Sequence, residues 1–297
     1  MTGLAPVEAP AARRQAYNTL AVDICALLAA ARERPIRLER GGLAPAELAR
    51  LREGLLFADP LRLELALALA RSKGWLAVDR DRLALNSQAA TAWLRLTPWE
   101  QMRSLFDAWR ESADAGPAGW NDLRRIPALH AEGAWRNDPL AARRGVLAAL
   151  AGLVAGNWYT LDGLASWIKT VNPDFQRPDG VYTGWYLRDV ETGRYLSGFE
   201  SWDEVEGRLI RFMLTGPLFW VGAVALDEDA TGRPHSFSLT PFGAAWLGQP
   251  PPAEGVERAA LTQTGQHVGQ RAAGGAVHQH VADRDHRQAS LLRRQGQ

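Results

Sequence analysis

The sequence contains a single cysteine, Cys25, among its 297 residues. One cysteine excludes an internal disulfide and a cysteine-based zinc site. Cys25 lies in the apolar run LAVDICALLAA, a context typical of a buried and unreactive thiol. We therefore expect no metal centre and no thiol nucleophile.

Lysine is almost absent, and its placement excludes a nucleotide-driven motor. The two lysines, Lys73 and Lys169, lie in RSKG and WIKT. A phosphate-binding P-loop needs its lysine directly after GxxxxG, which neither lysine has. Only His130 and His235 precede the C-terminal tail, and no serine lies in GxSxG. The sequence therefore predicts a protein that is not an enzyme and needs no cofactor.

Long apolar runs and a strong net charge are missing as well. The longest apolar stretches reach about half the length of a membrane span, and the N-terminus lacks the apolar core of a signal peptide. The net charge of +1 gives no strong field toward nucleic acid or an anionic membrane. We expect a cytoplasmic protein with no membrane contact and no small-molecule ligand.

The first third of the chain has the element order of a winged helix, a helix-turn-helix variant. Leu20, Ile24 and Leu27 recur at helical spacing, and the short extended run PIRL follows them. Pro45 and Pro60 each open a further helix, because proline fits the first helical turn. The runs WLAV and RLAL flank the turn DRD and predict a hairpin. Helix, strand, helix, helix and hairpin is the winged-helix order.

The same order recurs in the second half of the chain. PLAARRGVLAALAGLVA predicts a helix, NWYT is short and extended, and Thr160 is placed to cap the next helix. Ser201 and Glu204 have the spacing of a capping box before a third helix. GWLAV resembles FWVGAV, which matches Trp75 to Trp220, and RLALNSQAATAWL resembles FSLTPFGAAWL. The alternative is two unrelated segments that both end in Trp-Leu.

We predict a mainly α fold with small β-hairpins, of the α+β class, in which tandem winged helix-turn-helix units are joined by a helical connector. The connector begins at TPWE, where Thr97 and Glu100 form a capping box. The tail contains no aromatic residue and four of the six histidines, which we interpret as a solvated run and not as a metal site. The expected boundaries are a disordered N-terminus over 1–15, a first unit over 16–96, the connector over 97–138, a second unit over 139–248 with an insertion at 172–200, and a disordered tail over 249–297.

The insertion is unusually aromatic for a segment between two helices. WYLRDVETGRYL predicts a hairpin with Gly193 in its turn. Its aromatic side chains either brace the third helix as a small core or form an exposed platform for a partner or for nucleic-acid bases. Bracing is favoured, because clustered aromatic residues are more often buried than displayed. The candidate partner-binding residues are Tyr182, Trp185, Tyr186 and Tyr195.

These segments resemble bacterial helicase-associated proteins whose winged-helix region is similar to the N-terminal domain of the XPB-type helicases. The first unit contributes IRLERGGLAPAELARL and GWLAVDRDRLAL. The second contributes PDFQRPDG, WYLRDVETGRYL, GFESWDEVEG, GPLFWVGAV and FSLTPFG. The resemblance runs over roughly Tyr17 to Leu247. It implies a non-catalytic accessory to DNA unwinding or handling, with a helicase or nuclease as its partner.

The third helix of a winged helix usually enters the DNA major groove. In the second unit this helix begins with Asp203, Glu204 and Glu206, which repel phosphate and are explained by the helix dipole. We therefore look for DNA contacts among the arginines elsewhere. The candidate DNA-binding residues are Arg37, Arg40, Arg71, Lys73, Arg124, Arg125, Arg143 and Arg144. We expect weak, sequence-independent DNA binding; the alternative is a protein-protein interaction scaffold with no nucleic-acid binding.

Overall fold

The computed structural model describes residues 3–39, 42–113, 119–177, 179–227, 232–252 and 255–262. The chain divides into two compact units, residues 1–254 and residues 255–297. The described part of the second unit contains a short helix at 256–262, where the sequence predicts disorder. Within the described ranges, every helix falls short of the length or the apolar character that a bilayer crossing demands.

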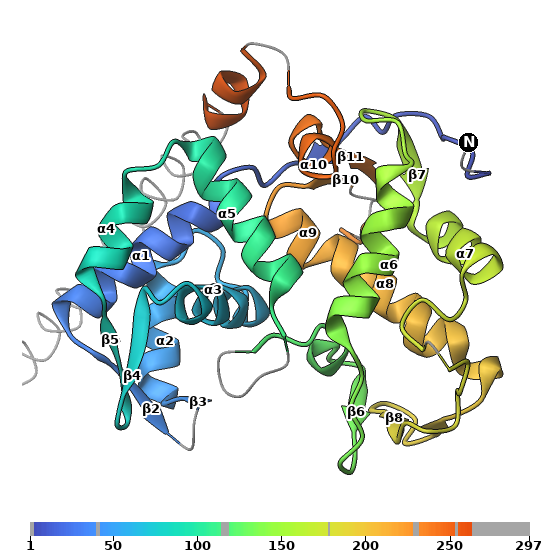
Figure 1. The fold of residues 1–297 in the computed structure, drawn as a ribbon, viewed down its shortest axis with the longest axis horizontal. Helices are drawn as coiled ribbons and strands as arrows, with labels where there is room; N and C mark the ends of the chain where they lie inside the picture. The colour runs from blue at the N-terminus through green and yellow to red at the C-terminus, as the bar shows by residue number, and fades with distance from the viewer. Residues whose placement is uncertain are drawn as a thin grey trace, which may run out of the picture. The chain divides into compact units, whose positions relative to one another are not determined.

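The part of the first unit that the structure describes combines helices with three small antiparallel sheets, so the α+β class is confirmed. The first region contains the expected elements in the expected order (Figure 1). They are α1 (Thr19–Glu33), β2 (Ile36–Glu39), β3 (Gly42–Leu43), α2 (Pro45–Gly54), α3 (Pro60–Ser72), β4 (Leu76–Asp79), β5 (Arg82–Leu85) and α4 (Ser87–Leu94). Asp59 caps α3 by accepting hydrogen bonds from the N–H groups of Leu61 and Arg62.

The connector begins with the predicted capping box and then continues into a strand. Thr97 and Glu100 satisfy each other's backbone N–H groups at the start of α5 (Pro98–Glu111). A 3₁₀ turn at Leu123–Arg125 leads to β6 (Leu129–Ala131). The sequence predicts the helix, but not the strand.

The second region repeats the order and adds elements between its second and third helices. It comprises α6 (Pro139–Ala151), β7 (Trp158–Thr160), α7 (Leu161–Val171), β8 (Leu187–Asp189), β9 (Tyr195–Leu196), a π-helical turn (Asp203–Gly207), α8 (Arg208–Thr215), α9 (Pro217–Trp220), β10 (Val224–Asp227), β11 (Ser236–Leu239) and α10 (Pro241–Trp246). Thr160 caps α7 as predicted, by accepting from the Gly163 N–H. The predicted Ser201 cap is wrong, because the Ser201 hydroxyl donates to the Ser197 carbonyl instead.

The two regions share strand order and register. In each region the strand after the first helix pairs with the second strand of the hairpin. The resulting strand orders are β2-β5-β4 and β7-β11-β10. Leu76 lies opposite Leu85 in the first sheet, as Val224 lies opposite Leu239 in the second.

The register also corrects the sequence match between the two regions. Gly74 and Gly222 both precede the hairpin and have positive φ angles of 69° and 78°. The next residues, Trp75 and Ala223, each donate a backbone hydrogen bond to the carbonyl five residues earlier. Trp75 therefore corresponds to Ala223. Trp220, to which the sequence match assigned it, ends α9.

The N-terminal segment is ordered, which corrects the predicted disorder of residues 1–15. Strand β1 (Arg13–Arg14) pairs with β10 at one edge of the second sheet. Val7 forms a bridge with Trp158 of β7 at the opposite edge. Tyr17 then stacks on Phe242 of α10 at a centroid distance of 3.8 Å. The segment thus engages both edges of the second sheet before the chain enters α1.

The connector helix α5 lies in the core between the two regions (Figure 1). It packs against α1 and α3 of the first region and against α6 of the second. Its Phe106 stacks on Trp246 of α10 at a centroid distance of 5.3 Å. Met102, Leu105, Phe106 and Trp109 are fully buried. The connector is therefore a structural part of the fold and not a tether.

One close approach in the second sheet gives a test of this packing. A Cβ atom at Gly243 of α10 would lie 2.1 Å from the Ala223 carbonyl oxygen, so Gly243→Ala must displace backbone. We expect Gly243→Ala to lower the free energy of unfolding by about 1–3 kcal/mol in denaturant titrations. Gly54→Ala is the control, because no atom lies within 4 Å of its Cβ position. Equal effects of the two substitutions would contradict the close approach.

Candidate interaction surface

The insertion at 172–200 contains the predicted hairpin and one additional strand. β8 pairs with β9, and β6 of the connector pairs with the other edge of β8. Asp189 closes the turn by accepting hydrogen bonds from the Glu191 and Thr192 N–H groups, while Gly193 adopts a φ of 71°. The Thr192 N–H, the Arg208 guanidinium and the Thr192 hydroxyl lower the pKa of Asp189. The hairpin is therefore a defined structure that is held to the connector.

Alternating guanidinium groups and aromatic rings join the insertion to the connector. Trp135 stacks on Trp185 with centroids 5.1 Å apart and planes 14° apart. The Arg124 Cζ atom lies 4.8 Å from the Trp135 ring centroid, and the Arg177 Cζ atom lies 3.8 Å from that of Trp185. Arg177 also lies 4.8 Å from the Tyr182 ring. These rings therefore pack within the insertion and against the connector, whereas the favoured interpretation expected them to brace the third helix.

A buried ion pair fixes the base of the insertion. Glu206 Oε1 accepts hydrogen bonds from Arg177 Nε at 2.5 Å and from Gln176 Nε2 at 3.1 Å. All three residues are buried, and Glu206 is completely inaccessible. This burial raises the pKa of Glu206, although Arg177 and Gln176 oppose the rise. The sequence analysis assigned Glu206 to the helix dipole; the structure shows that it anchors the insertion.

The insertion carries several exposed apolar side chains. Of eleven exposed large apolar side chains in the described residues, five belong to the insertion. Tyr186 is 62% exposed and Tyr195 is 55% exposed. The other three are Val181, Val190 and Phe199. Of the four candidate partner-binding residues, these two tyrosines are the ones available to a partner.

A polar cluster fixes the position of the exposed Tyr195. His130, Arg188 and Tyr195 lie in one row across β6, β8 and β9. Glu132 accepts a hydrogen bond from the Tyr195 hydroxyl at 2.8 Å and pairs with Arg188 at 2.7 Å. The Glu132 carboxylate raises the pKa of Tyr195, because it favours the protonated hydroxyl. Both tyrosine and arginine are thus held in place before any partner arrives.

Both third helices are mostly buried. In α3, every side chain from Leu65 to Ala70 is buried. In α8, no residue is exposed, and its arginines Arg208 and Arg211 pair with Asp189 and Asp162. A recognition helix must present side chains to the base edges. Both helices instead form core.

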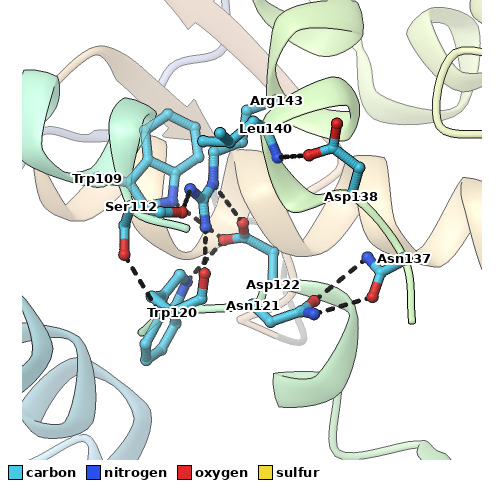
Figure 2. Close-up of polar contacts among 9 residues, drawn as sticks. All are labelled: Trp109, Ser112, Trp120, Asn121, Asp122, Asn137, Asp138, Leu140 and Arg143. Atoms are coloured by element: carbon cyan, nitrogen blue, oxygen red, sulfur yellow. Dashed lines mark hydrogen bonds and ion pairs between the residues drawn. The ribbon is translucent and has the colours of Figure 1, made fainter. Parts of the chain in front are cut away.

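Arg143 is a correction to the candidate DNA-binding set, because it is completely buried. Its Nε atom pairs with Asp122 at 2.7 Å, and its Nη1 and Nη2 atoms donate to the carbonyls of Ser112 and Trp120 (Figure 2). The indole N–H groups of Trp109 and Trp120 donate to the other oxygen of Asp122. Because Arg143 is completely buried, phosphate cannot reach its guanidinium, and it acts as a structural residue.

The remaining candidate cations are dispersed. Arg144 is exposed and lies 3.5 Å from Asp138, Arg124 covers Trp135, and Arg125 pairs with Glu64. Arg71 and Arg125 line one cavity of about 270 Å³, whereas Lys73 lines another of about 390 Å³. Arg37 is exposed on β2, and Arg40 lies outside the described residues. Of the candidate cations that the structure describes, Arg71 and Arg125 are thus the two that line the same cavity.

The sequence pattern does not identify the residues that build this region, namely Asp122, Trp135, Arg177 and Glu206. Their partners are distant along the chain and no spacing rule identifies them. The described residues contain no group of three side chains suited to hold a metal ion, and the tail histidines lie outside them. No family model, no curated protein and no solved structure matches this chain.

The neighbouring arginines Arg143 and Arg144 give a matched test of the buried network. Arg143→Ala leaves the Asp122 charge buried without its partner, so we expect a loss of about 3–5 kcal/mol in the free energy of unfolding. Arg144→Ala removes an exposed pair and should change it by less than about 1 kcal/mol. Denaturant titration followed by tryptophan fluorescence measures both values. Similar effects at the two positions would show that Arg143 is not structural.

Proposed function

We propose that this chain is a non-catalytic accessory protein built from two winged-helix units, and that it acts by docking onto a partner protein through the insertion. The repeated order of first strand beside third strand, with the same register in both sheets, supports two units of one kind. The resemblance to helicase-associated proteins makes a helicase or nuclease the expected partner. The chain carries no motor of its own, since its lysines lie outside any P-loop.

The burial of both third helices is the observation that favours docking over base reading. A winged helix that reads DNA keeps this helix exposed. Here the solvent-facing apolar side chains are concentrated on the insertion, where the Arg177–Glu206 pair anchors the chain. Protein interfaces are enriched in tyrosine, phenylalanine and arginine, and a rigid surface loses less entropy on binding. The insertion contains exposed tyrosine and phenylalanine side chains, and the buried Arg177–Glu206 pair holds it in place.

We expect charged substitutions on the insertion to weaken partner binding. Tyr186→Asp combined with Tyr195→Asp should raise the Kd for a purified helicase or nuclease encoded beside this chain by at least about tenfold. Biolayer interferometry measures the change. Val154→Asp is the matched control, because Val154 is 61% exposed but lies after α6, outside the insertion. An unchanged Kd in the double variant, with binding intact in the wild type, would exclude the insertion as the docking surface.

Weak DNA contact is a second candidate function, favoured by a different observation. Arg37 and Lys73 are exposed, and among the described residues neither has a carboxylate within ion-pair distance. Unpaired cations are free to replace counterions on phosphate without sequence preference. This contact would supplement docking and not require the third helices.

The salt dependence of duplex binding tests this second candidate. Each phosphate contact contributes a slope of about −0.9 to log affinity against log salt. The double variant Arg37→Ala with Lys73→Ala should therefore make this slope less negative. The change should be at most about twice the contribution of one phosphate contact. Arg103→Ala is the control, because Arg103 already pairs with Asp107 at 2.9 Å. No binding at low salt, or a flat salt dependence in the wild type, would leave docking as the remaining function.

A further inference from the structure

The outer edge of β4 in the first region is bare, whereas the matching edge in the second region is covered. β4 ends its sheet, whose order is β3-β2-β5-β4, so no strand of the described residues pairs with its outer side. In the second sheet, β1 occupies that place beside β10. Because the two sheets share strand order and register, these two edges can be compared residue by residue.

β4 and β10 have almost the same sequence. β4 reads LAVD and β10 reads VALD. Leu76 and Val224 occupy the same place in their hairpins, so Asp79 matches Asp227. In the covered edge, Arg13 of β1 lies opposite Asp227. Opposite charges placed directly across an antiparallel pair stabilise it, so β1 shows which side chain suits this edge.

The bare edge is also accessible. Every residue of β10 is buried, whereas the last three residues of β4 are exposed. Val78 is 54% exposed, against 2% for Leu226 at the matching place in β10. An exposed edge strand with an apolar side chain is a template for a further strand.

The backbone polar groups of Leu76 and Val78 face away from the hairpin. Asn86 donates to the Trp75 carbonyl at 2.8 Å, so this carbonyl faces the end of β5. In an antiparallel pair the direction alternates along the strand, which turns Ala77 toward β5 and its two neighbours away from it. The outer edge therefore offers two N–H groups and two carbonyl groups to a strand placed beside it.

The carboxylate of Asp79 has no hydrogen bond or ion pair with any described residue. Arg82 lies opposite Asp79 in the hairpin, but it pairs with Asp81 at 3.7 Å instead. An arginine placed beside β4 as Arg13 is placed beside β10 would thus meet an available carboxylate.

We propose that the outer edge of β4 binds an extended segment of a partner protein that has an arginine opposite Asp79. The segment runs antiparallel to β4, as β1 runs to β10, and its backbone pairs with that of Leu76 and Val78. In this mode of recognition the backbone hydrogen bonds supply affinity and the side chains supply specificity. The surface belongs to the first region, so it goes beyond docking through the insertion and does not depend on it.

A fluorescent peptide with the sequence of residues 8–17, EAPAARRQAY, tests the proposal on the full chain, because it contains the β1 strand. Fluorescence anisotropy measures its Kd. Val78→Pro removes an outward N–H group and leaves the ladder to β5 intact, so it should raise the Kd at least fivefold. Val78→Thr is the matched control, because it keeps the N–H group, and it should change the Kd less than twofold. An unchanged Kd in Val78→Pro would place the peptide elsewhere, including on β10, and would overturn the proposal.

A charge exchange tests the arginine. Asp79→Arg should raise the Kd of this peptide at least fivefold and should lower that of the same peptide with both arginines replaced by glutamate. Asp81→Arg is the control, because Asp81 already pairs with Arg82 and lies in the turn. If Val78→Pro fails to fold, this exchange decides, and equal effects of Asp79→Arg and Asp81→Arg on both peptides would overturn the proposal.

A second copy of the chain is the competing occupant of this edge. Absence of peptide binding at millimolar concentration would overturn the proposal. If Val78→Pro then abolishes self-association in sedimentation velocity, the edge belongs to a second copy.

Discussion

The ion pair between Arg143 and Asp122 is the interaction on which the arrangement of the two regions depends. Arg143 belongs to α6, whereas Asp122 and both accepting carbonyls belong to the connector. A buried arginine is tolerated only when its charge and its donors are satisfied, so the connector must hold one conformation around it. The connector in turn supplies α5 to the core and β6 to the insertion. One residue therefore sets the position of several elements.

Buried arginine–carboxylate pairs occur at two further places in the described residues. Arg62 pairs with Asp23 in the first region, and Arg177 pairs with Glu206 at the base of the insertion, in both cases with almost no exposure. Each pair joins segments that lie well apart in sequence. Buried pairs of this kind add little net stability, but a misplaced partner is heavily penalised. They therefore select one packing of segments whose leucine and alanine surfaces would fit together in several ways.

Local rules predicted the elements that depend on local chemistry. The capping box at Thr97, the cap at Thr160 and the hairpin turn at Gly193 follow from residues close in sequence. The sequence match between the two hairpins was misplaced by three residues, since a shared tryptophan outweighed the glycine with positive φ that precedes each hairpin. The burial of Arg143 was not predictable from local sequence, because the partners that satisfy its guanidinium are Asp122 and two carbonyl groups distant along the chain. Glu206 was misread for the same reason.

The ordered N-terminal segment has a consequence for synthesis on the ribosome. Arg13 pairs with Asp227, so the ribosome synthesises its strand partner more than two hundred residues after it. Until then, the edge of the second sheet has no strand to receive it. The first region therefore emerges with β1 unpaired, and β1 can join the second sheet only after β10 has been synthesised.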